Sequence, residues 1–186
     1  MIKLIKWTDR KFEFNLPVSL FPTIVSRIAG VPARLEEIAT ALTPEQLTTR
    51  TDDAWSVQEH IGHLMDLEEL HHGRFDEYMQ NIEKLTPADM TNKKTYDAGH
   101  NSKNIQDILK KFREVRREYV KKLDSVNEET AARTALHPRL NQPMRLIDNI
   151  FFAAEHDDHH IAIIRRIIQE NWSRSFNYPA GLSFNK

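Results

Sequence analysis

The stretch IFFAAEHDDHHIAII, residues 150–164, decides the fold more than any other part of the chain. Its apolar residues recur at the spacing of one helix face, in a stripe that continues beyond both ends. This stripe consists of Leu146, Phe152, Ala153, Ile163, Ile164 and Ile167. His156 and His160 fall within the stripe, four residues apart, so their rings should lie one turn apart on the core-facing side. The charged residues off this face, where we expect water, are Asp157, Asp158, Arg165 and Arg166.

Two imidazoles on a core-facing stripe need polar partners, because burying an unbonded polar group costs about 1–3 kcal/mol. A divalent ion between His156 and His160 would satisfy both rings, and histidines four apart on a helix suit such an ion. The alternative is that each is a core histidine bonded to a side chain or a carbonyl. For two histidines on one stripe, the spacing favours the ion. A third ligand must then come from a facing helix.

The segment that follows Trp55 offers the third ligand. Ser56 and Glu59 have the spacing of a capping box, so a helix should begin there and continue to about Ile82. Its polar candidates are His60, His63, His71, His72, Glu59, Asp66, Glu68 and Glu69. His60 and His71 lie closer to the apolar centre of this helix than His63 does. Spacing alone therefore ranks His60 level with His63.

The rest of the chain predicts an all-α protein, because helix-forming stretches alternate with proline-marked breaks. The long helices are expected at 21–42, 56–82, 104–126 and 143–169, each spanning about 30–40 Å. Pro32 should kink the first helix or delay its start to Gly30, and Pro143 suits the first turn of the last. Thr43 should cap a short helix. The polar loop from Glu83 to Lys103 has the length of a crossover or a lid.

The length of 186 residues suits a single domain, 1–186. Within it we expect an N-terminal arm (1–17), a helical bundle (18–172) and an irregular tail (173–186). Apolar residues of the arm, Trp7 and Phe12 among them, should pack on the bundle or on a second subunit, which makes a homodimer plausible.

Composition excludes several classes of function. The formal net charge of −1 supplies no field that would attract nucleic acid or an anionic membrane. No apolar run reaches the roughly 18 residues of a membrane span, and the N-terminus lacks a signal-peptide core, so we expect a cytoplasmic protein. Cysteine is absent, which removes disulfides, thiolate ligands and cysteine nucleophiles. Any thiol chemistry would need a thiol from outside the chain.

The segment WSVQEHIGHL, residues 55–64, followed by Glu68, resembles the second-helix signature of the DinB/YfiT-like superfamily. In that signature a Trp-Ser/Thr-Val helix start precedes a ligand histidine by eight positions, which selects His63 rather than His60. HDDHHIA, residues 156–162, is similar to the family's helix with histidines four apart. His137-Pro138 with residues 144–146 resembles the stretch before that helix, and residues 31–35 resemble the first helix of the family's bacillithiol transferases. The resemblance covers about residues 20–170.

This resemblance implies an up-down-down-up four-helix bundle, often dimeric, that holds one divalent ion, zinc or nickel, through His63, His156 and His160. Three neutral imidazoles leave an ion an open position, which is typical of a catalytic site. The resemblance also implies activities such as transfer of a low-molecular-weight thiol cosubstrate to an electrophilic small molecule, or thiol-dependent isomerisation. The alternatives are a metal-dependent hydrolase that activates water, a stress-response protein that binds a metal or small molecule without turnover, and a helical interaction domain with core histidines.

Three further residues are candidates for catalytic roles. Asn149 lies two turns before His156 on the same face, so it orients a ligand or is an ordinary core amide. Glu68 is either a base near the ion or the partner of Arg116. Arg116, on the apolar stripe of its helix, requires an anion, which is either a protein carboxylate or that of a substrate. Three other histidines, His60, His137 and His159, are expected to support the fold or the ligands rather than to bind the ion.

Overall fold

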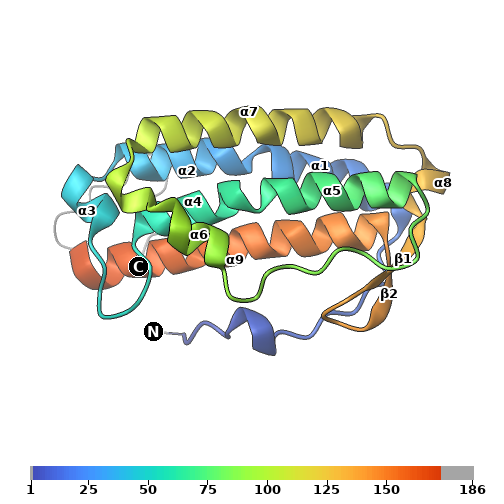
Figure 1. The fold of residues 1–186 in the computed structure, drawn as a ribbon, viewed down its shortest axis with the longest axis horizontal. Helices are drawn as coiled ribbons and strands as arrows, with labels where there is room; N and C mark the ends of the chain where they lie inside the picture. Colours follow the sequence, from blue (N-terminus) through green and yellow to red (C-terminus); the bar gives the residue numbers. More distant parts are fainter. Residues whose placement is uncertain (1, 173–186) are drawn as a thin grey trace.

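The computed structural model describes residues 2–172, in which four long helical arms lie side by side (Figure 1). The arms are formed by α1 (Phe21–Ala29) with α2 (Val31–Thr40), α4 (Val57–Asp66) with α5 (Glu68–Met79), α7 (Ile105–Asp124), and α9 (Leu146–Trp172). The shorter elements are η1 (Trp7–Asp9), η2 (Val18–Leu20), α3 (Pro44–Thr48), α6 (Lys93–Ala98), η3 (His100–Ser102), α8 (Glu128–Ala131), β1 (Thr134–His137) and β2 (Gln142–Arg145). The predicted tail, 173–186, lies outside the described residues.

Each of the first two helical arms of the bundle is divided into two helices near its middle. The first is divided at Gly30, with Pro32 in the opening turn of α2, as the sequence predicts. The second is divided at Leu67 and ends at Met79, a few residues before the predicted end. Asn81 has a φ of 55°, a left-handed conformation that ends the helix there.

The start of the second arm is the capping box that the sequence predicts. Ser56 Oγ accepts a hydrogen bond from the Glu59 amide (3.2 Å), and Glu59 Oε2 accepts one from the Ser56 amide (2.9 Å). The short helix α3 begins with the same arrangement at the predicted cap, Thr43. Local side-chain chemistry therefore sets both helix starts.

The start of the fourth arm differs from the prediction. Pro143 belongs to β2, which pairs antiparallel with β1 in a small two-stranded sheet, so the expectation of a purely helical chain was wrong. Asn141, with a φ of 49°, supplies a left-handed position in the connecting turn. Asp148 Oδ2 accepts a hydrogen bond from the Arg145 amide (3.0 Å), which caps α9 three residues after the predicted start.

The segment 83–103 is partly ordered by its own elements. Leu85 is buried, and its amide donates to the Leu136 carbonyl (3.1 Å), so the segment runs beside β1. It then forms α6 and η3, which both contact α4. This segment therefore places side chains next to the middle of the bundle.

The hydrophobic core consists of two clusters, one toward each end of the bundle. The first joins the start of the first arm, the ends of α5 and α7, and the start of α9; its members include Phe21, Ile28, Phe75, Tyr119 and Ile150. The second includes Leu35, Ile61, Leu64, Phe112 and Ile164. Along each of the last three arms, buried polar residues lie between the two clusters; they are His63, Asp66, Glu68, His71, Arg116, Asp157 and His160. The middle of the bundle is therefore a polar layer.

The N-terminal arm packs on its own bundle, which is one of the two predicted placements. The rings of Trp7 and Phe12 contact Phe152, with centroids 4.9 and 5.0 Å apart. Arg10 forms an ion pair with Glu155, and Arg145 Nη2 donates to the Leu16 carbonyl (2.9 Å). Trp7 thereby reaches the polar layer.

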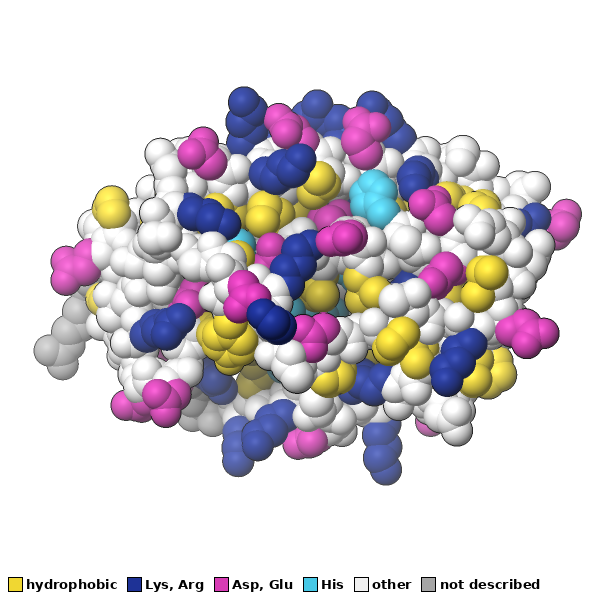
Figure 2. Space-filling model, in the orientation of Figure 1, with side chains coloured by type: hydrophobic (Ala, Val, Ile, Leu, Met, Phe, Trp, Pro, Cys, Tyr) yellow, Lys and Arg dark blue, Asp and Glu magenta, His cyan; other side chains and the backbone are white. Residues whose placement is uncertain are grey.

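The surface carries charges of both signs. On the face shown in Figure 2, basic and acidic side chains are interspersed, and neither sign dominates a broad area. Among the described helices, none combines the length and the apolarity that crossing a membrane requires.

Candidate metal centre

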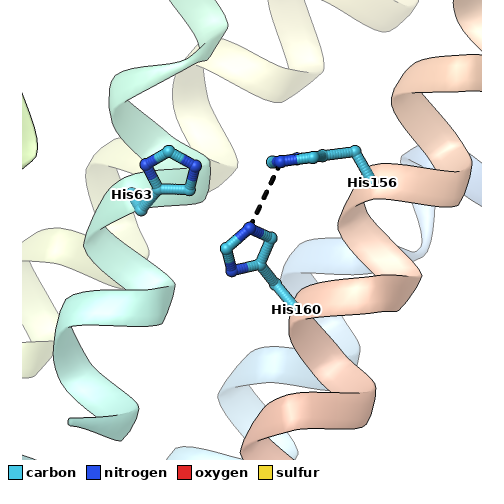
Figure 3. A group of neighbouring side chains, drawn as sticks. All are labelled: His63, His156 and His160. Carbon is cyan, nitrogen blue, oxygen red and sulfur yellow. Dashed lines mark hydrogen bonds between the residues drawn. The ribbon is translucent and has the colours of Figure 1, made fainter. Parts of the chain in front are cut away.

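Three histidine side chains from two helices meet in the polar layer. His63 projects from α4 toward His156 and His160 on α9 (Figure 3). One ring nitrogen of each histidine can be chosen so that all three atoms lie within 4.8 Å of one another. His160 Nε2 lies 3.2 Å from His156 Nε2. The structure therefore brings together the three residues that the sequence and its resemblance select.

The orientation of His63 is set by a chain of hydrogen bonds behind it. Thr95 Oγ1 donates to Asp66 Oδ2 (3.0 Å), so its lone pair accepts the hydrogen bond from His63 Nδ1, also at 3.0 Å. The proton of the neutral ring is therefore on Nδ1. The lone pair on Nε2 remains free for a ligand.

The same carboxylate receives a second donor from η3. His100 Nε2 donates to Asp66 Oδ2 (2.8 Å), and the His100 ring lies directly against Gly62. A β-carbon at Gly62 would overlap that ring. Glycine at position 62 is thus required for the close approach that supports the adjacent His63.

His60 contacts the site through the ring of His160. Its Nδ1 lies 2.8 Å from His160 Nδ1, so one of these nitrogens donates to the other. When His160 donates, its proton is on Nδ1 and its Nε2 lone pair faces His156. His60 therefore supports a ligand ring and is not the third ligand that spacing alone allowed.

The four histidines are neutral near pH 7. Burial lowers the pKa of His63 to about 4, and burial together with the nearby His63 lowers the pKa of His60 to about 3. Burial also lowers the pKa of His156 and His160 well below the usual value for histidine. Neutral imidazole is the form that binds metal.

These donors fit a divalent transition-metal ion. His156 Nδ1 is buried without a hydrogen-bond partner among the described residues, and no carboxylate belongs to the group of three. Nitrogen donors suit zinc, nickel, copper or iron(II), whereas magnesium and calcium prefer oxygen. The residues present therefore match the kind of ion that the resemblance implies.

The three histidines line a cavity of about 300 Å³. Trp55 covers one side, with its ring 4.8 Å from that of His63, and Trp7 of the N-terminal arm lies 4.8 Å from His156. Phe152 lines the cavity one turn before His156 on α9. The cavity is thus large enough for a small molecule and has aromatic walls.

The three candidates for catalytic roles lie in different places. Asn149 lines the cavity, is buried, and has no partner for Nδ2 among the described residues. Neither Glu68 nor Arg116 lines it. Instead Arg116 Nη2 donates to Glu68 Oε1 (2.6 Å), which is the partnership that the sequence offered as the alternative to a catalytic role.

Asp157 corrects an expectation. It was placed on a solvent-facing side of its helix, but it is buried and accepts a hydrogen bond from Arg116 Nη1 (2.7 Å). The reason is that α9 contacts both α1 and α4, so more than one of its faces is covered. Asp158 is only half-buried, and it pairs with Arg27 and Arg34.

Two residues at the cavity, Arg74 and Arg139, were missed by sequence reasoning. His137, predicted to be structural, also lines it, as do two histidines that the sequence had named, His71 and His159. Thr95 holds His63 from a segment whose position the sequence does not predict. The one local signal was Gly62, because a glycine inside a helix often marks close packing.

Comparisons with known proteins identify a family and a fold. The sequence profile of the DinB superfamily matches residues 27–164. A similar solved structure is described as "YfiT from Bacillus subtilis is a probable metal-dependent hydrolase with an unusual four-helix bundle topology"; it has a TM-score of 0.75 and 20% identity, over 87% of this chain and 93% of that one. A mycothiol-dependent maleylpyruvate isomerase has a TM-score of 0.61 and 8% identity, over 83% of this chain and 67% of that one. At sequence identities this low, the two structural matches show a shared fold alone. No curated protein sequence matches significantly.

Proposed function

Because the chain belongs to the DinB superfamily, we propose that it is a metal-dependent enzyme that activates a low-molecular-weight thiol for attack on an electrophile. One observation carries the proposal: three neutral imidazoles from two helices converge on the wall of a cavity that is large enough for a small molecule. A purely structural ion would need no such cavity.

His63, His156 and His160 would hold the ion, zinc or nickel, through one nitrogen each. When bound there, a divalent ion supplies Lewis-acid chemistry, which lowers the pKa of a thiol or of water. Thr95 and Asp66 keep the proton of His63 on Nδ1, and His60 can hold the proton of His160 on Nδ1 by accepting it. An ion would replace the proton shared by the Nε2 atoms of His156 and His160.

The thiol must come from outside, because the chain has no cysteine. Trp7 and Trp55 flank the histidines and keep bulk water away from the reacting groups. The resemblance to thiol-transferring relatives, and the structural likeness to an isomerase named as mycothiol-dependent, support a thiol over other nucleophiles.

The proposal includes an up-down-down-up order of the helical arms. It is supported by the order in which each arm meets the two core clusters. The first arm and α9 pass from the first cluster to the second, whereas the second arm and α7 pass in the opposite direction.

The second candidate is a hydrolase at the same centre, with water in place of the thiol. It is favoured by the description of the Bacillus subtilis structure as a probable metal-dependent hydrolase. The two candidates differ in one measurable property, because only the first requires an added thiol for turnover.

Metal analysis of tag-free protein, purified without chelator, tests the centre. We expect one divalent ion per chain in the wild type, almost none in His63→Ala, and the wild-type content in His72→Ala. His72 is a suitable control because it donates to the Val115 carbonyl and does not line the cavity. Wild-type metal content in His63→Ala would contradict the proposed ligand set.

Turnover is tested with the metal-loaded protein, bacillithiol or a simpler thiol, and monochlorobimane as the electrophile. We expect a rate above that of His63→Ala that depends on the thiol. A rate equal to that of the variant would exclude thiol activation of this substrate class, and hydrolysis without any thiol would select the second candidate. Bound metal with neither reaction would leave a metal-binding protein without turnover.

A further inference from the structure

The end of the cavity beside Phe152 carries hydrogen-bond donors that have no anion to bind. Arg74 is 4% exposed, and its Nε and Nη2 both donate to the Thr86 carbonyl (3.0 and 2.9 Å). No carboxylate among the described residues pairs with it. A buried guanidinium normally has an anionic partner, because desolvation of an unpaired charge is costly.

The remaining nitrogen of Arg74 faces another donor. Arg74 Nη1 lies 3.4 Å from His137 Nε2. His137 Nδ1 accepts a hydrogen bond from the Leu140 amide (3.2 Å), so the proton of the neutral ring is on Nε2. The Nη1–H group of Arg74 and the Nε2–H group of His137 therefore point into the same space. Both are donors, so neither can accept a hydrogen bond from the other.

Two more donors border this space. Arg139 lies over the Phe152 ring, with Cζ 5.4 Å from the centroid, and its Nη2 is buried without a partner among the described residues. Asn149 is 3% exposed, and its Nδ2 is likewise unpartnered. The ring of His137 also contacts Phe152, with the centroids 5.2 Å apart. Arg139 and His137 thus lie against the ring of Phe152, and Arg74 and Asn149 line the same cavity.

Acceptors that could satisfy these donors are scarce. Asp89 is the one acidic residue among the described residues that line the cavity. Its Oδ1 accepts from the amide and hydroxyl of Thr91, and its Oδ2 accepts from the Lys93 amide. Its carboxylate is therefore already occupied, and the cavity keeps an excess of positive charge.

We propose that this end of the cavity binds the carboxylate of a small-molecule ligand, through Arg74, His137, Arg139 and Asn149. This inference deepens the proposed function and rests on it for the identification of the ligand as a reactant. Phe152 and Asn149 precede His156 by four and seven residues, which is about 6 and 10 Å along the helix. The carboxylate is thus separated from the reacting atom by several bonds.

The binding of glutarate to the full-length protein tests this inference without any reaction. Isothermal titration compares glutarate with glutaramide, which has the same skeleton without the charge. The titrations are made with metal-loaded protein and again after chelation, so that direct binding to an ion is separated from binding to the arginines. We expect glutarate to bind at least tenfold more tightly than glutaramide in both forms. Equal affinities would overturn the proposal.

Arg139→Met is the decisive variant, because the Arg139 side chain makes no hydrogen bond to any other residue that the structure describes. We expect it to weaken glutarate binding about tenfold, the effect of losing one charge-assisted hydrogen bond. Arg117→Met, which removes an exposed charge from α7, should leave the affinity unchanged. Equal weakening in both variants would show that only net charge matters and would overturn the assigned site.

Two further measurements complete the test. Asn149→Leu should weaken glutarate binding without changing glutaramide binding, and an equal effect on both ligands would contradict its assigned role. Tighter binding of glycerol 3-phosphate than of glutarate would overturn the carboxylate in favour of a phosphate. Because no thiol or electrophile is present, failure of these titrations is distinct from failure of the thiol assay.

Discussion

Two buried arginines, one in the polar layer and one at the cavity, have opposite surroundings. Arg116 is 2% exposed and is held by two carboxylates, through Nη2 to Glu68 Oε1 (2.6 Å) and Nη1 to Asp157 Oδ2 (2.7 Å). Arg74 is buried to nearly the same degree, yet it meets a carbonyl and a histidine N–H. Burial disfavours both guanidinium charges, but Asp157 and Glu68 raise the pKa of Arg116, whereas burial lowers that of Arg74.

The difference separates a residue that holds the bundle together from one that lines the cavity. Arg116 joins the second arm, α7 and α9, and its Nη1 also donates to the Ile28 carbonyl of α1 (3.2 Å). It is internally compensated and lines no part of the cavity. Arg74, in contrast, has no carboxylate partner among the described residues. An unpaired buried charge of this kind is typical of a binding site.

The largest effect expected is on the free energy of unfolding. Arg116→Met leaves two buried carboxylates without their cation, and we expect it to cost about 3–5 kcal/mol. Arg74→Met removes an uncompensated buried charge together with two hydrogen bonds, so we expect a loss of at most about 1.5 kcal/mol. Urea denaturation of both variants measures the difference. Equal losses would contradict the distinction between the two arginines.

Lowering the pH should decrease the stability of the folded chain through its buried histidines. The pKa of His63, lowered by burial to about 4, means that the unfolded chain binds a proton between pH 6.5 and 4 and the folded chain does not. This contribution to stability is therefore full above pH 6.5 and is lost as the pH falls toward 4. For His63 alone we expect a loss of about 3 kcal/mol in metal-free protein.

Denaturant midpoints measured at several pH values test this prediction. His63→Phe removes one titrating group, so its stability should fall less steeply over the same range. A wild-type stability that stays constant from pH 6.5 to 4.5 would show that the ring is not desolvated as the structure has it.

A smaller effect is expected where His60 supports His160. His60→Ala removes the acceptor of the His160 Nδ1 proton, and we expect zinc affinity to fall about 10- to 100-fold. His60→Asn keeps an acceptor and should lose less. Competition with a chromophoric chelator measures both affinities. Unchanged affinity in His60→Ala would assign that histidine to packing alone.

The smallest effect is expected behind His63. Thr95→Val breaks the hydrogen-bond chain to Asp66 and should weaken zinc binding about tenfold, since the ring then loses its fixed orientation. Thr40→Val is the matched control, because Thr40 donates only to a carbonyl within α2. The zinc affinities are measured by the same chelator competition. Equal affinities of the two variants would show that Thr95 does not support the metal site.

The parts of the fold that depend on local patterns could be predicted from the sequence. The capping box at Ser56, the break near Gly30 and the long helices follow from residues close together in the chain. The pairing of His156 with His160 is likewise local, because four residues separate them. The choice of His63 over His60 needed the family resemblance, since both lie on the same helix and only the position of α9 distinguishes them.

The rest depends on packing between distant segments. Asp157 was misplaced because a helix covered on more than one side has no single solvent face. Arg74 and Arg139 reach the cavity, and Thr95 reaches His63, from three separate segments, and no spacing within any one segment indicates it. The strands β1 and β2 are four residues each and carry little apolar alternation, so the proline at 143 was a misleading sign of a helix start.

The N-terminal arm forms one wall of the cavity through a single aromatic side chain. Trp7 is anchored by ring contacts and by the adjacent Arg10, which pairs with Glu155, and not by a place in the bundle core. Substitutions in this N-terminal segment can change the width and polarity of the cavity. The four long helical segments of the bundle would keep their packing. The compounds that the cavity admits therefore depend on a short stretch of chain outside the four long helical segments.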